Sequence, residues 1–113
     1  INGFPEIFAD REHIKECLMN ILLNSFQAMP DGGEINIKAI AQDSKFVAVT
    51  ISDTGIGIPL ENMDKIFEPY FTTKRLGIGL GLSVTKRIIE EHSGKIEVES
   101  NGIGTSVKVM LPV

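Results

Sequence analysis

The first periodic stretch of the chain has the spacing of a helix. Its apolar and small side chains recur every three or four residues, at Ile14, Leu18, Ile21, Leu22, Ser25, Phe26 and Met29. Asp10 stands just before this stretch, where its side chain can cap a helix, and Pro30 and the glycines at 32 and 33 stop the pattern. We therefore predict a helix that starts after Asp10.

A second helix and four strands are predicted further along. The helix runs from about Leu82 to His92, where a Ser-Gly pair ends it. "EINIKAI" and "FVAVTIS" alternate apolar and polar residues around "AQDSK", and "KIEVES" and "TSVKVML" do so around "NGIG", so each pair indicates a hairpin. Helices that bury one face on such strands make a two-layer α/β sandwich, with a mixed or mainly antiparallel sheet.

Composition supports a single domain over residues 1–113. Hydrophobic residues make up 42% of the chain, which favours a globular protein. The net charge is −4 and the basic residues are scattered, so no nucleic-acid partner is expected. The one cysteine, Cys17, is expected to pack in the first helix, and no apolar run has the length of a membrane span. We expect the chain, which begins at Ile1 without Met, to be part of a longer protein.

Three amides gather on one side of the predicted first helix. Asn20, Asn24 and Gln27 lie together on a helical wheel, roughly opposite the stripe formed by Ile14, Leu18, Leu22 and Met29. A solvated face is one interpretation, but such faces are more often built from Glu, Lys and Arg. The other interpretation is a ligand-facing stripe, because an amide oxygen can coordinate Mg²⁺.

The segment "DTGIGIP" is the second candidate for chemistry. It starts at Asp53, where a predicted strand ends, and it holds Gly55 and Gly57. Asp and Gly favour turns, so a plain turn is one interpretation. That interpretation leaves the apolar Ile56 and Ile58 unexplained. A carboxylate at the edge of an apolar slot can accept a hydrogen bond from the exocyclic amine of adenine.

A run of three glycines in "LGIGLGLSVTKRI" precedes the second helix. Glycines let backbone N–H groups approach an anion, and a helix N-terminus adds unpaired donors, so phosphate binding is possible here. The run lacks the spacing of the dinucleotide fingerprint and the Gly-Lys-Ser/Thr of a Walker A loop. By itself, such a run is more typical of a mobile surface loop.

Together these segments resemble the catalytic ATP-binding domain of sensor histidine kinases, in the superfamily shared with DNA gyrase, heat-shock-chaperone and mismatch-repair ATPases. "MNILLNSFQAMPDGG" is similar to the asparagine box, "DTGIGIP" and "GIGLGL" to the two glycine boxes, and "IFEPYFTTK" to the phenylalanine box. The closing "HSGKIEVESNGIGTSVKVMLP" is similar to the final hairpin. The resemblance implies a Bergerat-type ATP-binding fold, an α+β two-layer sandwich with helices on one face of a mixed, mainly antiparallel sheet.

The resemblance also implies roles for single residues. Asn24 is the Mg²⁺ ligand, Asn20 a second polar contact near the phosphates, and Asp53 the adenine-reading carboxylate. Lys74 is expected to reach the terminal phosphates, and with Asn20 and Asn24 it forms the catalytic set. The other implied nucleotide contacts are Gly55, Gly57, Ile58, Phe67, Gly77, Gly79, Leu80, Gly81 and Thr105, of which Gly77, Gly79 and Gly81 belong to the lid over the triphosphate.

Three functions remain open: a histidine kinase catalytic domain, an ATP hydrolase and a binding module. The hydrolases of the superfamily have a glutamate where this chain has Asn20, a poor general base, which favours the kinase. The runner-up to the histidine kinase is a serine-directed protein kinase of the same superfamily. His13 and His92 are interpreted as structural, so the acceptor histidine is expected on a separate helical dimerisation domain, with a response regulator as an indirect partner. We expect a cytoplasmic domain without direct membrane contact, whether or not the parent protein is anchored.

Overall fold

The computed structural model describes residues 11–42, 45–58, 61, 63, 65–67, 81–100 and 104–112. Within them, two helices and four strands follow one another along the chain: α1 (Arg11–Gln27), β1 (Ile35–Gln42), β2 (Phe46–Asp53), α2 (Gly81–Glu91), β3 (Lys95–Ser100) and β4 (Thr105–Pro112). Every one of these elements was predicted from the sequence, with ends that differ by a few residues. The predicted N-cap, Asp10, lies outside the described residues.

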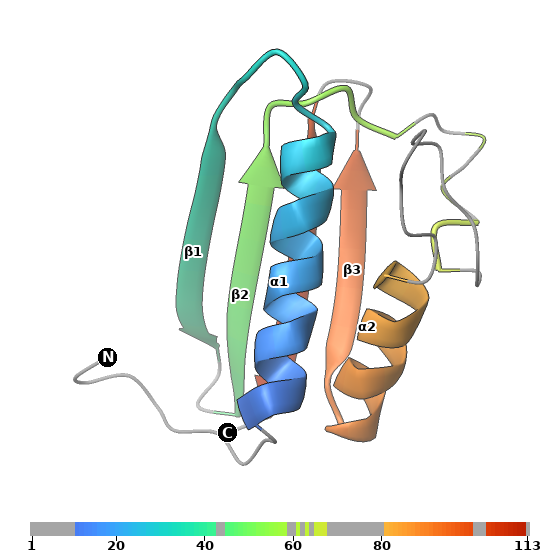
Figure 1. Ribbon diagram of the computed structural model, residues 1–113. Coiled ribbons are helices and arrows are strands. Elements are labelled where there is room, and N and C mark those ends of the chain that lie inside the picture. Colours follow the sequence, from blue (N-terminus) through green and yellow to red (C-terminus); the bar gives the residue numbers. More distant parts are fainter. Residues whose placement is uncertain are drawn as a thin grey trace.

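The four strands form one sheet in the order β1-β2-β4-β3, and both helices lie on one face of it (Figure 1). All three strand pairs of the described sheet are antiparallel. Two of them are the predicted hairpins, whereas the central pair joins β2 to β4 across a long stretch of sequence. The expected α+β sandwich is confirmed.

The core lies between this sheet and the two helices. Its buried residues come from every element except β1: Cys17, Ile21, Ile51, Ile88, Ile89, Ile96, Val107, Val109 and Leu111. In the strands they follow the alternation that was expected, because successive side chains point to opposite faces. Burying this apolar surface is the main favourable term for the fold.

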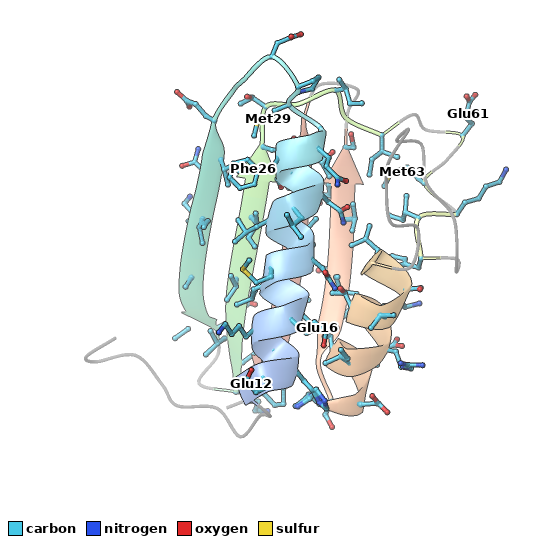
Figure 2. All side chains as sticks on the ribbon, viewed as in Figure 1. Glu12, Glu16, Phe26, Met29, Glu61 and Met63 are labelled. Carbon is cyan, nitrogen blue, oxygen red and sulfur yellow. The ribbon has the colours of Figure 1, made fainter. Side chains whose placement is uncertain are left out.

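The buried face of α1 differs from the predicted stripe. Cys17, Ile21, Ser25 and Ala28 are buried, whereas Leu18 and Leu22 only flank this face. Phe26, which the periodicity assigned to the same side, is 63% exposed and lies toward β1 (Figure 2). The amide-bearing side of the helix is therefore next to the core and not opposite to it.

The two helices also contact each other. The Cys17 thiol donates to the Thr85 carbonyl oxygen at 3.9 Å, which joins α1 to α2 inside the core. Near the start of α1 and just after the end of α2, the His13 and His92 rings meet edge to face with centroids 6.4 Å apart. Among the described residues no helix is both long and apolar enough to cross a membrane.

Candidate functional site

The ends of α1, β2 and β3 and the start of β4 come together at one end of the sheet. The chain leaves α1, β2 and β3 at this end, and β4 starts there (Figure 1). Met29 marks the position where the chain turns from α1 toward β1 (Figure 2). The asparagine box and the first glycine box therefore reach the same edge of the molecule.

Three polar side chains form a row across this end of the sheet. Asp53 is paired with Thr105, and Thr105 is paired with Ser100 on the next strand. The core residue Ile51 lies two positions before Asp53 in β2, and the core residue Val107 lies two positions after Thr105 in β4. Ile51 and Val107 are paired with each other. Because side chains alternate along a strand, the row lies on the face that the helices cover. All three of its residues are half-buried.

The Asp53 carboxylate is held in a fixed orientation. Its Oδ1 atom accepts a hydrogen bond from the Gly55 backbone N–H at 2.9 Å, which makes a local Asx turn. The interpretation of "DTGIGIP" as a plain turn therefore accounts for the role of the Oδ1 atom. It does not account for the half-buried position of the group beside Thr105.

The loop after Asp53 is attached directly to the end of α1. The Ile56 N–H donates to the Ala28 carbonyl oxygen at 3.0 Å, and the Ala28 N–H donates to the Asn24 carbonyl oxygen at 3.0 Å. A Cβ atom on Gly55 would collide with the Ala28 backbone, so only glycine permits this approach. The backbone thus links Asn24 to the glycine box through two consecutive hydrogen bonds.

Thr54 adds a second attachment, to the turn that follows α1. Its hydroxyl accepts from the Glu34 N–H at 3.0 Å and donates to the Met29 sulfur at 3.7 Å. Its own N–H donates to the Glu34 carbonyl oxygen at 3.2 Å. The site edge of β2 is therefore connected, on both sides of Gly55, to the segment that follows α1.

The β3–β4 end supports the loop from the opposite side. The Gly104 N–H donates to the Gly55 carbonyl oxygen at 2.8 Å. The Ser100 hydroxyl donates to the Gly104 carbonyl oxygen and accepts from the Ile58 N–H, both at 2.8 Å. Gly104 has a φ of +78°, and a Cβ atom there would collide with the Asp53 carbonyl oxygen.

The remaining part of the loop combines a tight backbone with apolar side chains. Gly57 is buried and has a φ of +75°, a conformation that glycine adopts without steric cost. Ile58 is half-buried, whereas the side chain of Ile56 is 61% exposed. The loop that follows the Asp53 carboxylate thus presents apolar side chains, which are suited to pack against a flat apolar ligand.

The remaining predicted site residues fall into three groups. Asn20 and Asn24 are half-buried on α1, one turn apart, and Gln27 is exposed. Phe67 is half-buried and packs against the core, with the Lys86 ammonium 5.1 Å from its ring centroid, so part of this ring serves packing. Lys74, Gly77, Gly79 and Leu80 lie outside the described residues, and Gly81 is the first residue of α2.

Sequence reasoning missed Thr54 and Ser100. Each is a hydroxyl residue at the end of a strand next to a glycine-containing turn, where such side chains commonly bond to the backbone. That signal was available but did not identify their distant partners, Glu34 and Met29 for Thr54 and Ile58 for Ser100, which lie 20 to 42 residues away in the sequence. In the described part of the chain, no three His, Cys, Asp or Glu side chains group as a metal site.

The chain is similar to known kinases over nearly its whole length. The sequence profile of the family described as "Histidine kinase-, DNA gyrase B-, and HSP90-like ATPase" matches residues 9–113. The chain is 42% identical to Sporulation kinase E of Bacillus subtilis over 114 residues and 43% identical to the signal transduction histidine-protein kinase AtoS of Escherichia coli over 113 residues. These alignments cover 100% and 99% of this chain.

The structural comparison agrees with the sequence comparison. The catalytic domain of histidine kinase ThkA superposes with a TM-score of 0.83 and 38% identity, over 94% of this chain and 71% of that domain. The chain spans only 15% of Sporulation kinase E and 19% of AtoS. The chain therefore belongs to the histidine kinase-, DNA gyrase B- and HSP90-like ATPase family, as the catalytic ATP-binding domain of a sensor histidine kinase.

Proposed function

We propose that this domain binds Mg-ATP at the end of the sheet and donates the γ-phosphate to a histidine on a separate helical dimerisation domain of the same kinase. A response regulator then receives the phosphoryl group in two-component signalling, in the cytoplasm. The observation that carries the proposal is the Asp53 carboxylate, half-buried beside Thr105 and oriented by the Gly55 N–H at 2.9 Å.

Asp53 suits the role of adenine reader. With Oδ1 engaged by the loop backbone, we assign the other oxygen, Oδ2, to the exocyclic amine of the base. Thr105, directly across from it, supplies a hydroxyl that supports the same contact. Gly55 and Gly57 let the backbone run close to the nucleotide, and Ile58 borders the base.

The phosphate end of the site is assigned to α1 and to the second glycine box. The amide oxygen of Asn24 fits Mg²⁺, which prefers oxygen ligands and completes its shell with waters and substrate phosphates. When bound, the metal neutralises phosphate charge. Asn20, one turn earlier and also half-buried, is the second polar contact. Lys74, Gly77, Gly79, Leu80 and Gly81 are assigned to the triphosphate on the resemblance alone, and Phe67 to the rim.

Asn20 favours phosphoryl transfer over hydrolysis. An amide side chain cannot take a proton from water at neutral pH, so this position supplies no general base. A kinase needs the γ-phosphate positioned and shielded until the acceptor imidazole arrives. His92 is engaged through Nδ1 with the Ile88 carbonyl oxygen at 2.8 Å and packs against His13, so we assign the acceptor to the partner domain.

The test combines γ-labelled ATP with this chain and the dimerisation domain, mixed and separately. We expect label on the dimerisation domain only in the mixture, and we expect acid to remove it, because phosphohistidine is acid-labile. Replacement of the acceptor histidine by glutamine is the matched control and should abolish labelling. Acid-stable label would indicate a serine-directed kinase, and rapid phosphate release by this chain alone would indicate a hydrolase. Either result would contradict the proposal.

A further inference from the structure

Ser100 is one of two residues, with Gly104, through which the β3–β4 end holds the first glycine box. It is the last residue of β3, and its hydroxyl makes two hydrogen bonds of 2.8 Å. As donor it binds the Gly104 carbonyl oxygen, and as acceptor it binds the Ile58 N–H, 42 residues away in the sequence. One hydroxyl thus connects the loop that follows β2 to the connection between β3 and β4.

These bonds close a ring around the loop. The Gly104 N–H donates to the Gly55 carbonyl oxygen at 2.8 Å, so Gly55 and Ile58 are both fastened to the same two-residue support, Ser100 and Gly104. The segment from Gly55 to Ile58 is held at its two ends. Hydrogen bonds in such a chain polarise one another. If the Ser100 hydroxyl is removed, the Ile58 N–H and the Gly104 carbonyl oxygen both lose their hydrogen bond to it.

The loop that is held in this way carries the assigned contacts to the base. Gly55 orients the Asp53 carboxylate through its N–H, and Gly57 passes through a buried position with positive φ. Ser100 also stands in the row that contains Asp53 and Thr105, on the same face of the sheet. A change at Ser100 therefore reaches the base-binding side of the site through the loop.

We propose that Ser100 is a positioning residue for adenine recognition, which it serves by fixing the backbone of the Gly55–Ile58 loop. This inference rests on the proposed function, because the proposed function assigns the adenine base to that loop. Ser100 itself contacts no nucleotide in the proposal. Its action passes through the Ile58 N–H and the Gly104 carbonyl group.

Ser106 offers a matched control in the same sheet. Its hydroxyl pairs with that of Ser52 at 2.8 Å, across β2 and β4, whereas that of Ser100 binds the Gly55–Ile58 loop. Because Ser106 follows Thr105 directly, its side chain lies on the opposite face of the sheet. Ser106→Ala removes one half-buried hydroxyl interaction, as Ser100→Ala does, without releasing the loop.

The experiment titrates ATP and GTP into the wild-type chain and three variants. We expect Ser100→Ala to raise the Kd for ATP about tenfold and to reduce the preference for ATP over GTP. Ser106→Ala should stay within about twofold of wild type, and Ser100→Thr, which keeps the hydroxyl, should restore most of the affinity. Amide hydrogen exchange of nucleotide-free protein should show faster exchange at Ile58 in Ser100→Ala only.

The outcomes separate this inference from the proposed function. Equal Kd values for Ser100→Ala and Ser106→Ala, with wild-type binding intact, would overturn the role of Ser100 alone. Failure of Ser100→Thr to restore affinity would also overturn it, because the hydroxyl would then not be the cause. If the wild-type chain binds no adenine nucleotide, the proposed function fails, and the role of Ser100 in adenine recognition fails with it.

Discussion

Asp53 and Thr105 are paired directly across β2 and β4, the last residue of one strand against the first of the other. Directly opposed side chains lie on the same face of a sheet with Cβ atoms about 4.5–5.5 Å apart. A strand that comes late in the sequence thereby places a hydroxyl-bearing residue directly opposite a carboxylate from the first half of the chain. The pairing makes the edge of the sheet, and not either loop alone, the base of the proposed adenine site.

Asp53→Asn is expected to weaken ATP binding by about 1.5–3 kcal/mol, because an acceptor-only carboxylate is replaced by an amide that both donates and accepts. The preference of the chain for ATP over GTP should decrease together with the ATP affinity. Calorimetric titration of both nucleotides measures the two effects. Unchanged affinity in the variant, or equal affinity of the wild-type chain for ATP and GTP, would contradict the assignment of Asp53.

Asn24→Ala should impair Mg²⁺-dependent ATP binding more than folding. Although the side chain is half-buried beside the core, alanine has the higher helix propensity. We therefore expect the melting temperature without nucleotide to stay the same or rise. Gln27→Ala, an exposed position of the same helix, is the control. A large loss of stability with unchanged Mg-ATP affinity would indicate that Asn24 only packs.

Gly55→Ala should both destabilise the fold and weaken nucleotide binding. The added methyl group would collide with the Ala28 backbone, which cannot move as a flexible side chain could, and such overpacking costs about 1–3 kcal/mol. Chemical denaturation and ATP titration measure the two effects.

Gly32→Ala separates local strain from the site in this experiment. Its Cβ atom would meet nothing within 4 Å, although its φ of +93° is unfavourable for alanine. We expect it to lower stability and leave ATP affinity unchanged. If Gly55→Ala also left ATP affinity unchanged, the attachment of the glycine box to α1 would not matter for binding.

Stability should decrease in alkaline solution through Cys17. Burial raises the pKa of its thiol from 9.0 to about 11, Glu16 adds to the rise, and the hydrogen bond to Thr85 opposes it. Between pH 9 and 11 the unfolded chain releases this proton while the folded chain keeps it. The contribution to stability is therefore complete below pH 9 and is lost as the pH rises toward 11.

Cys17→Ala provides the comparison for this prediction. Both chains contain the same lysines and the same tyrosine, so the difference between their urea midpoints isolates the thiol. Cys17→Ala should be less stable at neutral pH because it leaves a cavity, and the gap should narrow between pH 9 and 11. A constant gap over this interval would show that the thiol has the same pKa in the folded and the unfolded chain, which would contradict the prediction.

The sequence determined the elements and the chemistry of their ends. The alternation in "FVAVTIS" and "TSVKVML" reflects a strand that is covered on one face, and the turn residues between the segments limit where each one can stop. The glycines at 55 and 57 stand where the backbone makes a close approach or takes a positive φ, which no other residue type allows at low cost. These constraints act within a few residues, so they can be read locally.

The tertiary structure decided which faces meet. On α1, periodicity alone could not choose the buried side, because Met19, Leu23 and Phe26 are apolar and yet exposed. The pairing of β2 with β4, and with it the row Asp53, Thr105 and Ser100, joins segments more than forty residues apart. Local patterns carry no information about such contacts, since the partner of a hydroxyl or a strand edge is selected only when the whole apolar surface is buried together.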